Sequence, residues 1–477
     1  MQNRTNPSPF FHSPAMNHLT YFASATRPAE TCVVGSGGFG RSFLAQARRI
    51  PLVNARVAVD REAAIAVAAL HSIGIAADQI AVCTTPAEAT DAWDRGQYIA
   101  AADVAILTGL PLDLLIEATG HPEAGARHAR LAIEAGWHVA LASKEVDSVI
   151  GPELARQAQA RGKVVTPVDG DQPSLLIGLI TWAQTLGLEI VAAGKSSEYD
   201  FVFDFATGSI DSNGRHADVP DFAGLWDLAD RDVPALVSAR ATACAVLPQR
   251  AVPDLCELQV VANSTGLSPD TPALHAPIAR ITEVPTMFAP VAEGGIMSKH
   301  ASLDVFHCLR APGEVSLAGG VFVIVRCDDA ETWDLLLGKG HVLSRDGRRA
   351  MMYIPRHLLG LEAATSVLDA VVHARSTGAQ QPRPTLDLVV RATRNLLAGS
   401  VLEMGGHHHS IDGTAAELVP AAPLGAGVPV PFYLAANRRL VRDVAAGQAI
   451  CFDDIEVDAH SELLALRRQQ DAAFFPG

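Results

Sequence analysis

A glycine-rich turn between an apolar strand and a helix is the feature that most constrains the fold. The pattern G-x-G-x-x-G at 35–40 directly follows the β-rich run TCVVG (31–35) and precedes a helix expected over 41–49. A second strand, ARVAV (55–59), ends at Asp60, 20 residues after the last glycine of the pattern. This spacing predicts a strand–helix–strand unit in which backbone N–H groups approach a pyrophosphate and Asp60 accepts hydrogen bonds from a ribose.

The alternation of strands and helices continues to about residue 170. Further strands are expected at 80–84, 114–119, 138–142 and 163–168, and further helices at 61–72, 124–135 and 152–161. Such alternation predicts an α/β fold with a doubly wound parallel sheet. We therefore expect a Rossmann domain over 29–170, preceded by a flexible N-terminal extension over 1–28.

The regularity loosens after Asp171. A helix (173–186) leads to the strand LEIVAAGK, and then come apolar runs at 260–266 and 321–325 and a helical stretch at 358–374. We expect an α+β domain over 171–377 that binds substrate and forms a dimer. A small β-rich C-terminal domain is expected over 378–477, and its first part contains a proline-containing linker (382–387).

Composition limits the partners. The chain has 37 basic and 52 acidic residues and a formal charge of −15, which disfavours nucleic acid and anionic membranes. No apolar run reaches the roughly 18 residues of a membrane span, and residues 1–27 lack the apolar core of a signal peptide. The seven cysteines include no C-x-x-C pair and are expected to be reduced. We expect a cytoplasmic protein that acts on a small molecule and forms a homo-oligomer.

Only five of the 37 basic residues are lysines, so each lysine is informative. Lys144 and Lys195 both stand at strand ends, where open α/β sheets place their ligands. Reduction of a carbonyl group needs a hydride donor over the carbon and a cation or acid at the oxygen, and a lysine can fill the second role. The catalytic candidates are Lys144, Lys195, Asp169 and Asp171.

The expected cofactor is NAD or NADP. Asp60 favours NAD, whereas Arg61 beside it could hold a 2′-phosphate. The turn after the strand at 114–119 could reach the nicotinamide. The residues predicted to bind the cofactor are Gly35, Gly37, Gly38, Phe39, Gly40, Asp60, Arg61, Thr119, Gly120 and Lys144.

Two motifs carry a resemblance to known enzymes. Ala142-Ser143-Lys144-Glu145, followed by VVTPVDGD (164–171), resembles the 1-deoxy-D-xylulose-5-phosphate reductoisomerases, and Gly194-Lys195 resembles the homoserine dehydrogenases. The first resemblance implies that Asp169 and Asp171 bind Mg²⁺ or Mn²⁺, with Asp171 standing where that family has Glu. Without a metal, the two carboxylates would orient substrate hydroxyls and a catalytic lysine. The second resemblance implies that Lys195 lies beside the reacting oxygen.

The resemblance covers roughly residues 31–375, and the tail resembles the SAF domain of antifreeze-like and sugar-acid enzymes. It implies an NAD(P)H-dependent oxidoreductase, with conversion of 1-deoxy-D-xylulose 5-phosphate to 2-C-methyl-D-erythritol 4-phosphate as the leading reaction. A homoserine dehydrogenase-like or polyol or sugar-acid dehydrogenase is the enzymatic alternative. A dinucleotide-sensing binding protein is the alternative of another class. The run GGHHH (405–409) is interpreted as an exposed loop rather than a metal site.

Overall fold

The computed structural model describes residues 17–326, 329–406 and 408–476. Within this part of the chain, the residues divide into two compact units, and neither unit is one continuous segment. The parallel-sheet unit comprises Asn17–Ser174, Leu255–Gly266 and the chain from Leu358 onward. The mixed-sheet unit comprises Leu175–Asp254 and Leu267–His357. A division of the sequence into consecutive domains does not anticipate this arrangement.

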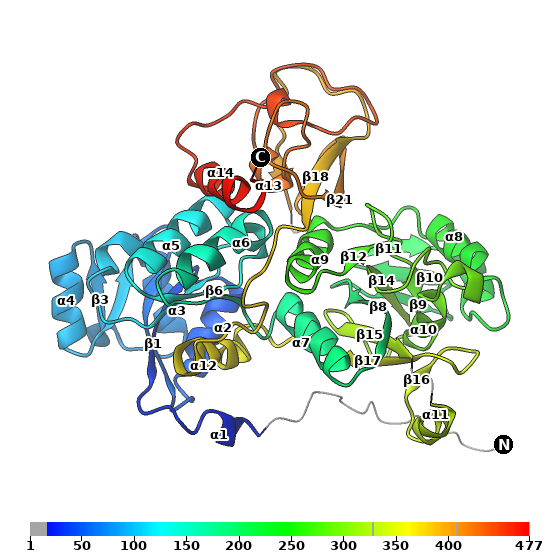
Figure 1. Cartoon of the computed structure of the whole chain (residues 1–477), viewed down its shortest axis with the longest axis horizontal. Coiled ribbons are helices and arrows are strands. Elements are labelled where there is room, and N and C mark those ends of the chain that lie inside the picture. The colour runs from blue at the N-terminus through cyan, green and yellow to red at the C-terminus, as the bar shows by residue number, and fades with distance from the viewer. Residues whose placement is uncertain (1–16, 327–328, 407, 477) are drawn as a thin grey trace. The chain divides into compact units, whose positions relative to one another are not determined.

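The parallel-sheet unit is built on seven strands, all paired in parallel, in the spatial order β3-β4-β2-β1-β5-β6-β7 (Figure 1). The strands are β1 (Ala29–Val34), β2 (Val53–Val59), β3 (Ile80–Cys83), β4 (Tyr98–Ala101), β5 (Leu114–Glu117), β6 (His138–Leu141) and β7 (Val165–Pro167). The strand order reverses beside β1, and ligands of such sheets bind outside the carboxyl ends of the strands at this point. The predicted doubly wound parallel sheet is confirmed.

Helices cover this sheet, which explains why its strands are nearly continuous apolar runs. They are α2 (Gly38–Ala47), α3 (Ala63–Ser72), α4 (Pro86–Asp94), α5 (Pro122–Glu134), α6 (Lys144–Gln159) and α12 (Ala364–His373). The last of these comes from far along the chain and packs against β1, β6 and β7. Its Val367 is fully buried in the same core as Val33, Phe43 and Ile116. The helix predicted at 358–374 therefore belongs to the parallel-sheet unit.

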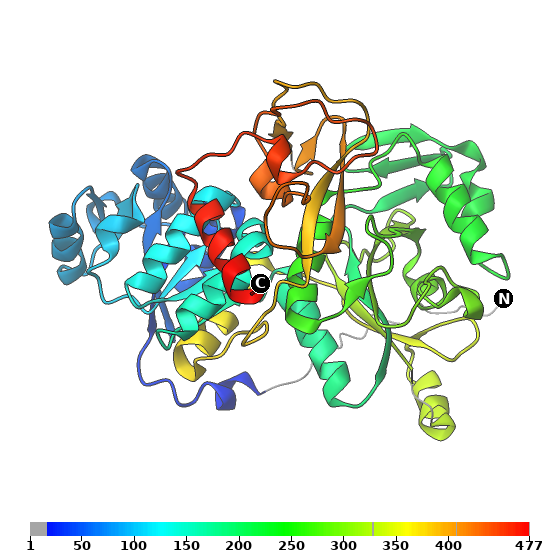
Figure 2. The same cartoon turned by 45° about the horizontal axis from the view of Figure 1, so that its top comes forward.

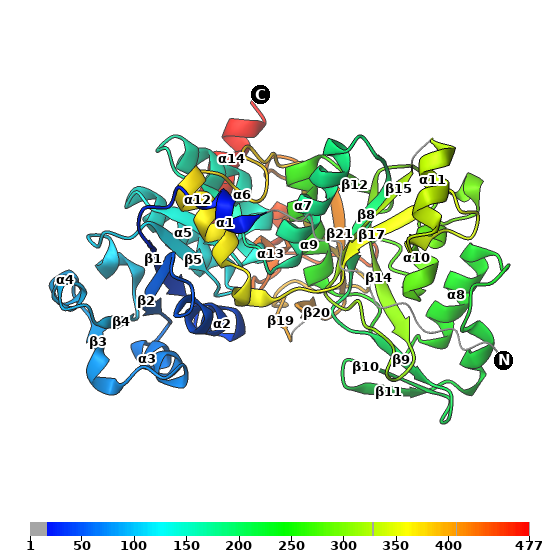
Figure 3. The ribbon, with the colours of Figure 1, turned by 90° about the horizontal axis from the view of Figure 1, so that it is seen from below.

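Of the N-terminal extension predicted over 1–28, the structure describes residues 17–28, and residues 1–16 lie outside the described part of the chain. The short helix α1 (His18–Tyr21) lies beside α12, as Figure 3 shows. The Phe22 ring stacks on His373, the Tyr21 ring is tilted against the same imidazole, and the Phe22 side chain is buried. Aromatic contacts therefore join this segment to α12.

The mixed-sheet unit is α+β, as predicted. Its main sheet follows the order β11-β10-β9-β14-β8-β15-β17-β16, and the short strands β12 and β13 pair with β14. The strands are β8 (Glu189–Ser196), β9 (Phe201–Asp204), β10 (Ser209–Ser212), β11 (Arg215–Asp218), β12 (Ser268–Pro269), β13 (Ile278–Ala279), β14 (Ser302–Arg310), β15 (Val321–Arg326), β16 (Val342–Leu343) and β17 (Ala350–Ile354). Its aromatic core packs Phe288 and Phe306 against Phe322.

Five helices belong wholly or partly to the mixed-sheet unit: α7 (Gln172–Thr185), α8 (Val233–Ala243), α9 (Val252–Thr265), α10 (Val284–Met287) and α11 (Ala330–Leu337). The apolar run at 260–266 lies almost entirely in α9. No helix of the described residues is long and apolar enough to cross a membrane. The six described cysteines are free thiols, and Cys327 lies outside the described residues.

The C-terminal region (residues 378–476) is β-rich, as predicted, and packs within the parallel-sheet unit. Its elements are β18 (Leu386–Ala392), β19 (Met404–Gly405), β20 (Ser410–Ile411), β21 (Thr414–Pro420), α13 (Phe432–Ala435) and α14 (Glu462–Phe474). Figure 2 shows the ribbon of β18 and β21 and, in red, α14 lying against α5 and α6. A buried ion pair of 2.6 Å joins Arg467 of α14 to Asp387 of β18, so helix and ribbon are held together.

Candidate functional site

The glycine turn after β1 has the geometry that close approach of a ligand requires. Gly35 has a φ of +95°, and a Cβ there would lie 2.5 Å from the carbonyl oxygen of Ala118. A Cβ on Gly40 would lie 2.0 Å from the carbonyl oxygen of Gly35. A Cβ on Gly37 or Gly38, by contrast, would meet no described atom within 4 Å. Two glycines thus serve the fold, and two leave open space at the N-terminus of α2.

The side chains around this turn fit a dinucleotide. The N–H of Ser36 donates to Asp60 Oδ2 at 2.7 Å, and the N–H of Arg61 donates to Asp60 Oδ1 at 2.8 Å. The carboxylate is thus fixed at the end of β2 and keeps lone pairs for ribose hydroxyls. The Ser36 hydroxyl is buried with no partner among the described residues, and a phosphate oxygen would satisfy it. Phe39 packs against the core of the sheet.

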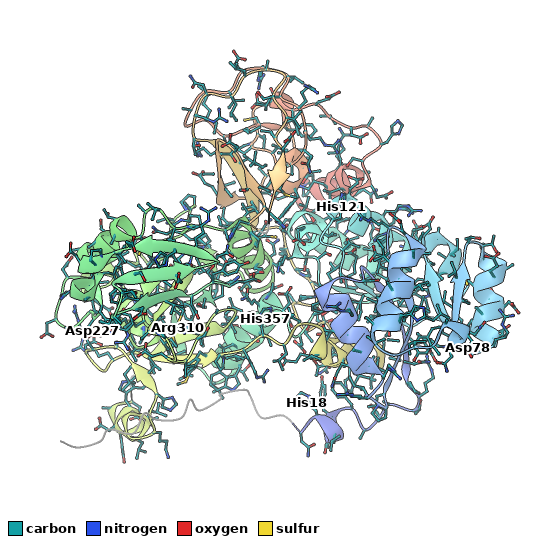
Figure 4. The ribbon with its side chains drawn as sticks, turned by 180° about the vertical axis from the view of Figure 1, so that it is seen from behind. His18, Asp78, His121, Asp227, Arg310 and His357 are labelled. Atoms are coloured by element: carbon teal, nitrogen blue, oxygen red, sulfur yellow. The ribbon has the colours of Figure 1, made fainter. Side chains whose placement is uncertain are left out.

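The turn after β5 is tied to the start of α6. The N–H of Gly120 donates to Ser143 Oγ at 2.8 Å, and the Thr119 hydroxyl donates to Glu117 Oε1 at 2.5 Å. His121, labelled in Figure 4, follows as the N-cap of α5. The structure therefore brings Thr119 and Gly120 to the same edge of the sheet as Lys144, as predicted.

Lys144 is the first residue of α6 and lies among carboxylates. Its Nζ is 2.6 Å from Glu257 Oε1 and 3.7 Å from Asp171 Oδ1, and its side chain is 19% exposed. Burial by itself would lower the pKa of Lys144, but the charges of Asp171, Glu257 and Glu145 raise that pKa well above its ordinary value. At neutral pH this site therefore presents a fixed ammonium group.

Glu257 is a site residue that the sequence analysis missed. It lies on α9, and its side chain is 1% exposed. The available signal was an acidic residue inside the apolar run LCELQVVA (255–262), because a glutamate is rarely buried unless it is paired.

The two predicted metal ligands do not share a site. Asp169 Oδ1 accepts from the Ser174 hydroxyl and Oδ2 from the Thr365 hydroxyl, both at 2.6 Å. Asp171 Oδ1 instead accepts from the Gln172 N–H at 3.0 Å and faces Lys144. Among the described residues, no group of three or more His, Cys, Asp or Glu side chains could hold a metal ion. The donor set therefore does not fit Mg²⁺ or Mn²⁺, since Asp169 links the turn after β7 to α12.

Gln172 is a second residue that the sequence analysis missed. Its side chain is 1% exposed, and neither carboxamide atom has a hydrogen-bond partner among the described residues. It directly follows Asp171, which faces Lys144. A buried amide without partners is costly, so a ligand that offers both a donor and an acceptor fits here.

Lys195 belongs to a separate cluster in the mixed-sheet unit. It stands near the end of β8, and its Nζ lies 2.7 Å from Asp254 Oδ1. The Ser197 hydroxyl donates to the other oxygen of Asp254 at 2.8 Å. The Lys195 side chain is 1% exposed, and that of Asp254 is 4% exposed. This lysine is thus held in a sealed ion pair.

The comparisons with known proteins support an oxidoreductase. Residues 253–363 match the family model described as oxidoreductase DRL, catalytic domain, and this segment includes Glu257. These residues are therefore similar to the catalytic domain of that oxidoreductase family. A search of the curated proteins found no match.

Several solved structures are distantly similar. Biliverdin reductase from Synechocystis sp. PCC 6803 is 18% identical over 37% of this chain and 48% of its own, with a TM-score of 0.24. This chain thus spans about half the length of that protein. 1-Deoxy-D-xylulose 5-phosphate reductoisomerase from Zymomonas mobilis is 16% identical over 74% of this chain and 82% of its own, with a TM-score of 0.31. GenD2 from gentamicin A biosynthesis is 16% identical over 74% of this chain and 88% of its own, with a TM-score of 0.33.

Proposed function

We propose that this chain is an NAD(P)H-dependent oxidoreductase that reduces the carbonyl group of a small polar compound. The observation that carries the proposal is the position of Lys144. Its ammonium group lies at the carboxyl edge of the parallel sheet, the same edge that carries the open glycine turn. Such an edge is where α/β sheets bind dinucleotides and their substrates.

The cofactor is held by this chain's own residues. The backbone at Gly37 and Gly38 and the Ser36 hydroxyl would hold the pyrophosphate, and Asp60 would hold a ribose. When bound, the nicotinamide supplies or accepts the hydride. The open space over the two glycines and the unpartnered serine hydroxyl support this assignment.

Lys144 stabilises the charge that develops on the carbonyl oxygen. Because its pKa is raised, the amine keeps its proton at neutral pH and can donate that proton only to a strong base such as an alkoxide. Glu257 and Asp171 hold the ammonium in place. This arrangement favours carbonyl reduction, since the reverse reaction would need a neutral amine.

For the substrate, we propose a phosphorylated ketose, with 1-deoxy-D-xylulose 5-phosphate as the first compound to test. The resemblance of residues 142–145 and 164–171 to the reductoisomerases supports this choice. A simple dehydrogenase acting on a homoserine-like, polyol or sugar-acid substrate is the second candidate. One observation favours that second candidate: Asp169 and Asp171 do not form the metal-binding pair that the first resemblance implies.

The decisive experiment incubates the purified protein with NADPH or NADH and a panel of phosphorylated ketoses, hydroxy-aldehydes, homoserine and sugar acids. Cofactor oxidation is followed by absorbance, and products are identified by mass spectrometry. A rearranged carbon skeleton in the product supports the reductoisomerase, whereas an unrearranged alcohol supports the simple dehydrogenase. If neither nicotinamide binds, the proposal fails.

The cofactor site has its own test. Gly37→Val should abolish dinucleotide binding, because the new side chain fills the space above the turn. Gly109→Val is the matched control, since a Cβ there also meets no described atom within 4 Å. Fluorescence titration measures both variants.

In Asp60→Ala, loss of the carboxylate should improve binding of NADPH relative to NADH, because the repulsion of a 2′-phosphate is removed.

A further inference from the structure

A polar cluster from three distant parts of the sequence meets the first turn of α6. Glu145 lies in that turn, Cys256 comes from α9, and His409 and Tyr433 come from the C-terminal region. The side chains of Glu145, Cys256 and Tyr433 are buried, and that of His409 is 20% exposed. His409 is therefore partly covered within a loop whose Gly405 and Gly406 are exposed, and His407 lies outside the described residues.

Tyr433 connects to this turn by two routes. In the first, its hydroxyl lies 2.9 Å from His409 Nδ1, and His409 Nε2 lies 4.0 Å from Glu145 Oε1. In the second, Tyr433 lies near Cys256, whose thiol donates to the carbonyl oxygen of Lys144 at 3.3 Å. The two routes end on consecutive residues, one of which carries the ammonium group of the site.

The position of His409 is locally unfavourable. Its φ is +50°, a left-handed conformation that residues with a Cβ rarely adopt. The ring is also packed edge-to-face on Tyr433, with ring centroids 5.8 Å apart. The tertiary contacts of His409 therefore outweigh a local preference for another conformation.

Several charged groups surround Glu145. Burial raises its pKa to about 7; the charge of Lys144 opposes this rise, while those of Asp171 and Glu117 add to it. An imidazole N–H directed at this carboxylate favours its ionised form. The ionisation of Glu145 in turn adds a third negative charge near the Lys144 ammonium, beside those of Glu257 and Asp171.

We propose that His409 and Tyr433 are positioning residues for Lys144, acting through Glu145 and Cys256. The C-terminal region is then part of the catalytic unit and not an independent appendage. The contacts stand by themselves, but their consequence for turnover rests on the proposed function. A Tyr433 hydroxyl that donates to His409 Nδ1 leaves His409 Nε2–H to face Glu145, and the Cys256 thiol keeps its one proton for the carbonyl oxygen of Lys144.

The first test does not need a substrate. The protein is produced with lysine carrying ¹³C at Cε, which gives five labelled side chains, and Lys144→Arg assigns one signal. The chemical shift of the Lys144 signal should change in one titration step near neutral pH, when Glu145 ionises. Glu145→Gln should remove this titration step. In His409→Gln and Tyr433→Phe, the step should move upward by roughly half a pH unit or more, because the carboxylate loses the imidazole that faces it at 4.0 Å or the group that orients this imidazole.

Matched controls are available in the same unit. His71→Gln removes an exposed histidine whose ring bonds to the Ile75 carbonyl oxygen, and Tyr21→Phe removes a hydroxyl near Asp369. Neither control should move the step. A step that stays at the wild-type pH in both His409→Gln and Tyr433→Phe, with the fold intact by circular dichroism, overturns the proposal.

The second test uses turnover on whichever carbonyl substrate the panel identifies. His409→Gln and Tyr433→Phe should lower kcat by roughly 5- to 30-fold and shift its pH profile, with dinucleotide affinity unchanged within about 2-fold. A loss of kcat that is equal at every pH means a merely structural role and contradicts the proposal. If the wild-type protein reduces no carbonyl compound, the proposed function fails, and the spectroscopic result still decides the role of these residues.

Discussion

Lys144 and Lys195 are both paired with acids of the same helix, α9, yet their surroundings differ. Lys195 lies 2.7 Å from Asp254, and its side chain is 1% exposed. Lys144 lies 2.6 Å from Glu257, keeps 19% of its side chain exposed, and also faces Asp171. The first is a closed pair, and the second is a partly open ammonium group among excess negative charge.

The difference indicates that one lysine stabilises the fold, whereas the other can contact a ligand. A closed pair has its charges matched and gains little from a third partner. An ammonium group with exposed surface and surplus carboxylates is held firmly and can still contact a carbonyl oxygen. Lys144 therefore carries the proposed chemistry, and Lys195 secures β8 to the start of α9.

The largest expected effect is on stability at the closed pair. Lys195→Met leaves the buried Asp254 without its cation and should lower the free energy of unfolding by about 3–5 kcal/mol. The double variant Lys195→Met/Asp254→Leu should recover much of that loss, because no unpaired charge remains. Urea unfolding measures both. A loss below about 1 kcal/mol in the single variant would show that the pair is not sealed.

The next effect is on turnover at the open lysine. Lys144→Arg keeps a positive charge but cannot give up a proton, so kcat should fall by roughly 10²-fold while dinucleotide affinity changes only a few-fold. Steady-state kinetics and fluorescence titration measure the two quantities. Lys339→Arg, at an exposed position, is the matched control. Near-normal turnover in Lys144→Arg, together with a large loss of turnover in Lys195→Arg, would show that Lys195 and not Lys144 carries the chemistry.

A third effect concerns the ionisation of Asp147, which lies on α6. Burial raises the pKa of Asp147 to about 7, so the folded state holds a proton that the unfolded state releases near pH 4. Stability should therefore fall as pH rises from about 4 to about 7. Asp147→Asn does not ionise and should be more stable than the wild type by roughly 4 kcal/mol at pH 8, with no difference below pH 4. Thermal unfolding across this range provides the measurement.

The smallest effect concerns Gln172. Gln172→Leu removes a buried amide that has no partner among the described residues, so the free protein should become more stable by about 1 kcal/mol. If the amide binds substrate, the same change should raise KM by about 10-fold with little change in kcat. Together these opposite effects distinguish a binding residue from a structural one. A destabilised variant with normal KM would assign Gln172 to the fold.

Much of the fold could be predicted because its signals are local. The glycine spacing, the strand that precedes it and the acid at Asp60 all lie within one strand–helix–strand unit. Alternating apolar strands and amphipathic helices likewise dictate a parallel sheet before any long-range contact is known. The position of Lys144 at a strand end follows from the same pattern.

Only the tertiary structure decided which groups surround Lys144. Glu257 and Asp171 come from different segments, and the Asp169 carboxylate is taken by hydroxyls of Ser174 and Thr365. A local pattern places a side chain on an element, but the partner of a buried charge depends on which distant elements pack together. The sequence by itself therefore determined where the open glycine turn and the lysine stand. Long-range packing decided that the lysine is an ammonium held by carboxylates and that its neighbours do not form the predicted metal site.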